Sequence, residues 1–181
     1  MQGAFAPKGI NGMKKAFFIW CLSLFLAGVS SVFAGGLPSY KTLCKALKDL
    51  PGWQAEKCEG MNISGSPMGE IVTAHRTYTN GNKQVEASIV CGLQAMEYWA
   101  PFDHIQIENN EGFAKVTNIR GYDVGIGYNK QDKTGGIVVK LTKRKEDVTS
   151  VFLLNFENMS WQEALNIAEL FDWDEMANML K

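Results

Sequence analysis

Residues 70–91, which read E-I-V-T-A-H-R-T-Y-T-N-G-N-K-Q-V-E-A-S-I-V-C, decide the fold of this chain. Two alternating segments flank Asn80-Gly81, a dipeptide that readily takes positive φ in a two-residue turn, so the stretch predicts a β-hairpin. With this loop, the mostly apolar face carries three cross-strand pairs: Val72 with Ile89, Ala74 with Ala87, and Arg76 with Val85. The other face carries three mixed pairs: Ile71 with Val90, Thr73 with Ser88, and His75 with Glu86. The apolar face requires a second layer to cover it.

The N-terminal part of the chain has the pattern of a secretory signal peptide. Met13-Lys14-Lys15 is a short basic region, residues 16–29 are an apolar run, and Val32-Phe33-Ala34 fits the site at which a signal peptidase cuts. The apolar run is shorter than the roughly 20 residues that a spanning helix needs. We therefore expect the N-terminal extension and signal, residues 1–34, to be removed, leaving a periplasmic or secreted protein with no stable membrane span.

Cleavage after Ala34 would leave residues 35–181, which is enough for a single domain with a sizeable core. The chain has 18 basic and 19 acidic side chains, and the removed part holds three lysines and no acid, so the remainder has a formal charge of −4. This balance argues against a nucleic-acid partner, because phosphate contacts need a clustered positive surface. The basic run at residues 140–145 is followed by Glu146-Asp147 and is predicted to be a solvated turn.

Three cysteines remain after cleavage: Cys44, Cys58 and Cys91. An oxidising compartment favours the pairing of two of them. Cys44 lies on a predicted helix and Cys58 on the segment that returns after Pro51-Gly52, which makes Cys44 with Cys58 the first choice and Cys58 with Cys91 the second. Three small buried thiols are the alternative.

Helical patterns occur at the start, the middle and the end of this part of the chain. Ser39 is the predicted N-cap of the first helix, which buries one face: Leu43, Ala46, Leu47 and Leu50. Residues 93–107 have helical spacing with a kink near Pro101. The last helix begins with a capping box, Ser160-Trp-Gln-Glu163, and a shorter helix begins near Asp172 or Asp174.

Strands are predicted between these helices. Residues 53–62 form a first strand that carries Trp53, Ala55 and Met61 inward, and residues 64–69 form a turn-rich loop before the hairpin. Four more strands follow the central helix, at residues 113–119, 122–128, 136–142 and 148–156. Their short polar connections favour antiparallel neighbours, because a parallel pair needs a long crossover. The predicted fold is α+β, a twisted and mainly antiparallel sheet with helices on one or both faces, in the order α-βββ-α-ββββ-α.

Several short motifs run through this chain: Leu50-Pro-Gly-Trp53, Met68-Gly69, Thr77-Tyr78-Thr-Asn-Gly81, Ala95-Met96 with Trp99, Glu111-Gly112-Phe113 and Phe171-Asp172-Trp173. In these features the chain resembles an uncharacterised group of small exported bacterial proteins. The order of its elements is also similar to that of the Mog1/PsbP-like sandwiches. Neither resemblance implies an established activity or transfers a catalytic residue.

Motifs for catalysis or metal binding are sparse. His75 opposite Glu86 could serve a hydrolytic or metal-dependent enzyme, but no nucleophile in a strained turn lies nearby in the sequence, and surface pairing is the favoured interpretation. The chain contains no C-x-x-C, H-x-x-x-H or H-E-x-x-H spacing. A copper site would need scattered donors, namely Met61, Met68 and Met96 with Cys91 or His75, and core filling explains the methionines better. We expect no catalytic residue, metal or cofactor.

The remaining candidate is an apolar pocket beneath the helix at residues 93–107. Its predicted lining is aromatic: Tyr98, Trp99, Phe102 and Tyr128. The sequence therefore favours a non-enzymatic exported binding or accessory module with an unknown protein or a small apolar ligand as partner. The first alternative is a carrier of a small apolar or lipid-like molecule, and the second is an enzyme built around His75 and Glu86.

Overall fold

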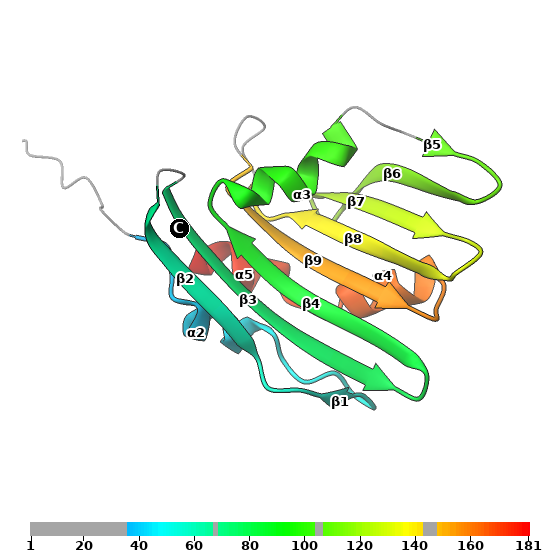
Figure 1. The fold of residues 1–181 in the computed structure, drawn as a ribbon, viewed down its shortest axis with the longest axis horizontal. Helices are drawn as coiled ribbons and strands as arrows, with labels where there is room; N and C mark the ends of the chain where they lie inside the picture. The colour runs from blue at the N-terminus through cyan, green and yellow to red at the C-terminus, as the bar shows by residue number, and fades with distance from the viewer. Residues whose placement is uncertain (1–35, 67–68, 104–106, 143–147) are drawn as a thin grey trace, which may run out of the picture. The chain divides into compact units, whose positions relative to one another are not determined.

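The computed structural model describes residues 36–66, 69–103, 107–142 and 148–181. The predicted signal peptide, Met68 and the basic residues 143–145 lie outside the described residues. The described part of the chain is α+β, with one antiparallel sheet and helices on both of its faces (Figure 1). The predicted fold class is therefore confirmed.

The sheet has nine strands in the described residues: β1 (Gln54–Ala55), β2 (Glu59–Ser66), β3 (Gly69–Asn80), β4 (Lys83–Cys91), β5 (Ile107–Glu108), β6 (Gly112–Ile119), β7 (Tyr122–Asn129), β8 (Thr134–Lys140) and β9 (Ser150–Glu157). Their order is β1-β3-β4-β9-β8-β7-β6-β5, and β2 also pairs with β3. Every pair is antiparallel. The pairing of β4 with β9 joins the first half of the sheet to the second half.

The hairpin of β3 and β4 doubles back as predicted, but its loop is Gly81-Asn82 and its first closing pair is Asn80 with Lys83. Gly81 takes a φ of 62° and Asn82 takes no positive φ, which fits a turn with glycine at its first central position. The two faces of the hairpin are as predicted, whereas each cross-strand partner is displaced by two residues. This register places Tyr78 opposite Val85, so it buries one more apolar pair.

The pairing predicted for His75 is therefore wrong. His75 lies opposite Ser88 on β4 and opposite Glu59 on β2, while Glu86 lies opposite Thr77. Glu86, the predicted carboxylate partner of His75, belongs to the next cross-strand pair along the same face of the hairpin.

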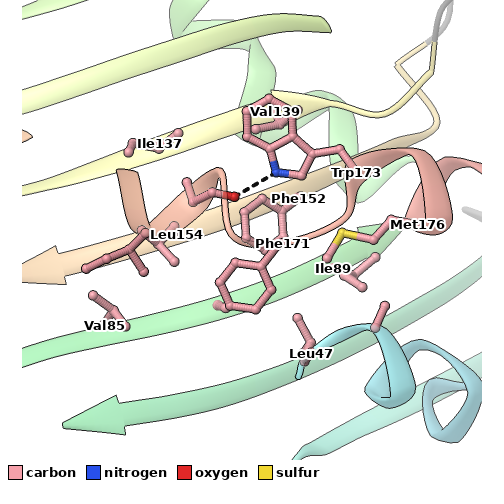
Figure 2. Packing of buried hydrophobic residues seen from close by; sticks show 14 of the residues in the cluster. Leu47, Val85, Ile89, Ile137, Val139, Phe152, Leu154, Phe171, Trp173 and Met176 are labelled. Carbon is pink, nitrogen blue, oxygen red and sulfur yellow. Dashed lines mark hydrogen bonds between the residues drawn. The ribbon is translucent and has the colours of Figure 1, made fainter. Parts of the chain in front are cut away.

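The main core lies between one face of the sheet and the helices α2 (Tyr40–Leu43), α4 (Trp161–Ala168) and α5 (Trp173–Met179), with the 3₁₀ helix η1 (Cys44–Ala46) following α2. Figure 2 shows the centre of this core, where Trp173 donates its indole N–H to the carbonyl of Ala168 at 3.0 Å. The other core residues labelled in Figure 2 come from strands and helices far apart in the sequence: Leu47, Val85, Ile89, Ile137, Val139, Phe152, Leu154, Phe171 and Met176.

The first helical segment begins as predicted, because the Ser39 hydroxyl accepts a hydrogen bond from the Thr42 amide. The four predicted core residues of this segment are buried: Leu43, Ala46, Leu47 and Leu50. Cys44 and Cys58 form a disulfide with Cα atoms 5.8 Å apart, and Cys91 is a buried thiol, so the first-choice pairing is confirmed.

The predicted first strand is divided into β1 and β2, and β2 continues through Ser64 and Gly65, which were expected in a loop. The prediction that Met61 points inward is wrong, since its side chain is 54% exposed. Met61 pairs with Thr73 on the face that carries no helix at this position, whereas the neighbouring Gly60 faces the core below Tyr40. The four later strands match β6 to β9 within two residues at each end.

Helix α3 (Gln94–Asp103) lies on the opposite face of the sheet and contains Pro101. It covers a smaller cluster of buried residues: Val90, Ala95, Trp99, Val138, Val148, Val151 and Leu153. The predicted end at residue 107 is wrong, because Ile107 already belongs to β5. Residues 104–106 lie outside the described part of the chain.

The two C-terminal helices begin at side-chain caps. The Ser160 hydroxyl accepts from the Glu163 amide at 3.2 Å, and the Asp172 carboxylate accepts from the Glu175 amide at 2.8 Å. Only half of the predicted capping box forms, since the Glu163 carboxylate binds the ammonium group of Lys83 at 2.6 Å. This ion pair connects the turn end of the β3–β4 hairpin with the start of α4.

Candidate functional site

The predicted aromatic site is divided between the two faces of the sheet. Trp99 and Phe102 lie together in α3, with ring centroids 5.9 Å apart, and Tyr98 on the same helix is exposed. Tyr128 lies on the other face, where it stacks on Phe156 with centroids 6.0 Å apart. The structure therefore does not bring the four predicted lining residues together.

The space beneath the C-terminal half of α3 is filled. The ring of Phe102 lies over Gly125 of β7, where an added Cβ would be 2.5 Å from the Phe102 Cγ. The buried Trp99 donates its indole N–H to the Asp103 carboxylate at 2.5 Å, and the Lys140 ammonium lies 5.9 Å from its ring. These contacts make this part of the helix a packed layer and not the roof of a cleft.

An apolar hollow of about 360 Å³ lies at the other end of α3. Leu37, Leu93, Met96 and Val148 contribute its apolar surface, and Leu93 and Met96 are about half exposed. The Glu70 carboxylate at its border accepts a hydrogen bond from the Leu37 amide at 2.9 Å. Its size and lining suit a small apolar ligand, and none of the four residues predicted to line a pocket borders it.

Helix α3 leaves part of its side of the sheet uncovered, and we call this uncovered part the open face (Figure 1). One row of cross-strand partners crosses it, running from β3 to β6: Thr77, Glu86, Asn155, Gly136, Gly127 and Ala114. The β7 and β8 members of this row, Gly127 and Gly136, carry no side chain, and a Cβ added at Gly127 would contact nothing within 4 Å.

A hollow of about 450 Å³ lies at the turn end of the open face. Its polar side chains are Gln84, Glu86, Thr134, Asn155 and Glu157. The carboxylates of Glu86 and Glu157 form no ion pair with the described residues. The hollow therefore presents acceptor groups and negative charge beside half-buried glycine residues of β7 and β8.

The register places a possible nucleophile, a base and an acid in one row, because Ser88, His75 and Glu59 are successive cross-strand partners. Nucleophilic catalysis needs these groups joined by hydrogen bonds, and among the described residues no such bond links the three side chains. The described residues also contain no group of three or more His, Cys, Asp or Glu side chains arranged to hold a metal ion.

Sequence reasoning missed a polar pair beside the C-terminal helix. The buried Tyr122 hydroxyl donates to the Asp174 carboxylate at 2.6 Å, and burial raises the pKa of Tyr122. The pair borders a hollow of about 480 Å³ that also includes Thr142, Thr149 and Ser150. The hydroxyl of Thr142 lies 3.1 Å from that of Thr149 and 3.2 Å from that of Ser150. Fifty-two residues separate Tyr122 from Asp174, so no local pattern indicates this contact.

Comparison of the chain with protein-family models, curated proteins and solved structures finds no match. Within the residues that the structure describes, no helix is long and apolar enough to cross a membrane.

Proposed function

We propose that the protein is a non-enzymatic binding or accessory module that acts outside the cytoplasm through the open face of its sheet. The observation that carries the proposal is the asymmetry of the two faces. Three helices and η1 seal one face over a large apolar core, while α3 covers only part of the other. The disulfide and the signal-like N-terminus support a location in an oxidising compartment.

The chemistry of the open face favours an extended polypeptide segment that carries lysine or arginine. Glu86 and Glu157 supply two carboxylates without a described ionic partner, and Gln84 and Asn155 supply amides that hydrogen-bond a peptide backbone. Because Gly127 and Gly136 project no side chain, an extended strand can approach the sheet closely there. Exposed charge pairs contribute little individually, so the affinity of one such segment should be modest and should fall with added salt.

The test is an NMR titration of the mature protein with deca-lysine, and with deca-glutamate in parallel. We expect deca-lysine to shift amide signals of residues 84–86, 134–136 and 155–157, and deca-glutamate to shift none of them. The double substitution Glu86→Gln and Glu157→Gln should weaken deca-lysine binding about fivefold. The matched control, Glu111→Gln with Glu169→Gln, makes the same charge change at exposed positions outside the open face and should leave binding unchanged. Equal weakening by both pairs, or shifts elsewhere, would refute the proposal.

A second candidate function is that of a carrier for a small apolar or lipid-like molecule, and the hollow at the start of α3 favours it. Native mass spectrometry of protein purified from the periplasm tests this candidate directly. A carrier should retain an apolar molecule, and the substitutions Leu93→Asp and Met96→Asp should remove it because both side chains line the hollow. Leu170→Asp is the control, since Leu170 is exposed and does not line this hollow. An unliganded mass in the unsubstituted protein counts against the carrier function.

A further inference from the structure

The apolar hollow at the start of α3 has one charged side chain at its border, the half-buried Glu70. It lies at the end of the β3–β4 hairpin opposite the turn, where β3 begins and the chain leaves β4 for α3 (Figure 1). The described residues that line it include no lysine, arginine or histidine. Glu70 also forms no ion pair with any other residue in the described ranges. The hollow therefore combines an apolar surface with a single negative charge.

Contacts between separate segments hold this carboxylate in place. The Leu37 amide donates to its Oε2 at 2.9 Å, whereas no described group donates to its Oε1. The Gly92 amide donates to the Thr149 carbonyl at 2.8 Å. A Cβ added at Gly92 would overlap the Glu70 carbonyl oxygen, so the glycine lets the chain turn into α3 directly against the start of β3. The site is therefore formed before any ligand arrives, and one carboxylate oxygen remains available to it.

We propose that this hollow selects a free amphiphilic amine, a molecule with one apolar chain and a protonated amino group that pairs with Glu70. The inference rests on the second candidate function, that of a carrier, and names the class of its ligand. The chain covers Leu93 and Met96, which are 55% and 49% exposed. The ammonium group meets the Glu70 carboxylate at the border of the hollow.

The charge of Glu70 separates this class from other lipid-like molecules. A neutral apolar ligand would remove water from the carboxylate without supplying a charge in return, which costs free energy. A fatty acid would add repulsion between two carboxylates. An ammonium group offsets the lost hydration of Glu70 and lets the rest of the ligand stay in the apolar part of the hollow.

The size of the hollow favours a free single-chain molecule over a lipid that stays in a membrane. Its volume of about 360 Å³ lies near the lower end of the range for small-molecule sites, about 300–1,000 Å³. In an aminophospholipid the ammonium group is close to a phosphate, and Glu70 would repel that phosphate. A free alkylamine has no such second charge.

NMR titrations of the mature protein with octylammonium, octanol and octanoate test the proposal, because the three probes share a chain length and differ in charge. We expect octylammonium to bind most tightly and to shift the amide signals of Leu37, Gly92, Leu93 and Met96. Octanoate should bind at least tenfold more weakly than octylammonium. Added salt should weaken the binding of octylammonium but not that of octanol.

The substitution Glu70→Gln removes the charge and keeps a side-chain oxygen that can accept from the Leu37 amide. It should weaken octylammonium binding about fivefold, since the ion pair is partly exposed, and it should not weaken octanol binding. Glu108→Gln is the matched control, because Glu108 is an exposed residue of β5 that does not line the hollow. It should leave the affinity for all three probes unchanged.

Several outcomes would overturn the proposal and still separate it from the carrier function. Equal affinity for octanol and octylammonium, or equal weakening by Glu70→Gln and Glu108→Gln, would refute selection by Glu70 while leaving a carrier of neutral ligands possible. Binding only to vesicles that contain an aminophospholipid would assign the hollow to a membrane surface. If no probe shifts the four amides, the amine is not the ligand, and the native mass of the purified protein decides separately whether the carrier function also fails.

Discussion

The ring of Phe102 in α3 occupies the space into which a side chain at Gly125 in β7 would project. A Cβ at position 125 would lie 2.5 Å from the Phe102 Cγ and 2.7 Å from both Cδ atoms. This contact brings the helix close to the sheet and fills the space beneath Phe102, where a ligand pocket was expected.

The substitution Gly125→Ala should lower the free energy of unfolding by about 1–3 kcal/mol, because the added methyl group overlaps the ring. Phe102→Ala should lower it by about 3 kcal/mol through loss of packing. In the double variant the alanine at 125 gains room, so the combined loss should be smaller than the sum of the two. Urea unfolding of the four proteins measures this coupling.

Gly127→Ala is the matched control, since it lies two residues along the same strand and on the same face, with no atom within 4 Å of its added Cβ. We expect a change of less than about 0.5 kcal/mol there. If Gly125→Ala and Gly127→Ala lowered the free energy of unfolding equally, strand propensity and not the Phe102 ring would account for the loss.

Removal of the disulfide should destabilise the protein strongly. Cys44 and Cys58 are 14 residues apart in the sequence, and closing a loop of this length stabilises the folded state by about 3 kcal/mol. The double variant Cys44→Ser with Cys58→Ser should therefore unfold at a lower urea concentration, and reductant should not lower its midpoint further. The buried Cys91 provides the control: Cys91→Ala keeps the bridge, so its midpoint should still fall when reductant is added.

Alkaline pH should weaken the fold through buried groups whose pKa is raised, and Tyr78 and Cys91 are two of them. Burial raises the pKa of Tyr78 to about 12 and also raises the pKa of Cys91 to about 12. An unfolded chain loses these protons near pH 10 for tyrosine and near pH 8.5 for cysteine. Each protonated group therefore makes its full contribution to the free energy of unfolding below the pKa that it has in the unfolded chain. Above that pKa the contribution falls by about 1.4 kcal/mol per pH unit for each group, until the pH reaches 12. Denaturant unfolding between pH 7 and pH 12 measures the slope.

The substitution Tyr78→Phe separates the titration from the packing. At pH 7 it should cost about 1 kcal/mol, because the Tyr78 hydroxyl donates to the Lys48 carbonyl at 2.8 Å. Between pH 10 and pH 12 the variant should lose stability less steeply than the unsubstituted protein, since one titrating group is gone. If stability fell with pH equally steeply in both proteins, the Tyr78 hydroxyl would not be a source of the alkaline destabilisation.

The N-cap of α4 should contribute measurably to stability. Ser160→Ala removes the hydroxyl that accepts from the Glu163 amide and should cost about 1 kcal/mol by thermal or urea unfolding. Ser160→Asp retains an acceptor at the cap and should restore most of this stability. If Ser160→Ala and Ser160→Asp lowered stability equally, the capping hydrogen bond would not be the cause of the loss.

The sequence predicted the two faces of the hairpin but not its partners, and the reason lies in the turn Asn80-Gly81-Asn82. This tripeptide offers two overlapping two-residue loops, and moving the loop by one residue displaces every partner by two. Because side chains alternate with a period of two, both registers keep the same residues on each face. The observed register buries Tyr78 opposite Val85. This advantage depends on the rest of the core, so the hairpin sequence alone does not select the register.

The candidate site was harder to predict for a similar reason. Tyr128 shares a face with Val124 and Ile126, whereas Gly125 and Gly127 lie on the side of the sheet that carries α3. Local sequence does not show which of these two sets lies on the side of the central helix. The fit of Phe102 onto Gly125 joins residues from different elements and has no local pattern. The Cys44–Cys58 bridge, in contrast, followed from a helix and a return segment close in sequence.

The enclosed position of Cys91 has a consequence for oxidative maturation. Cys91 lies in β4 between β3 and β9 and is fully buried, so its sulfur reaches another cysteine only when the centre of the sheet is open. Its raised pKa also keeps it as an unreactive thiol, while disulfide exchange requires a thiolate. Pairing of Cys91 with Cys44 or Cys58 would therefore require β4 to leave its place in the sheet. The buried thiol therefore takes no part in exchange with the Cys44–Cys58 bridge once the protein has folded.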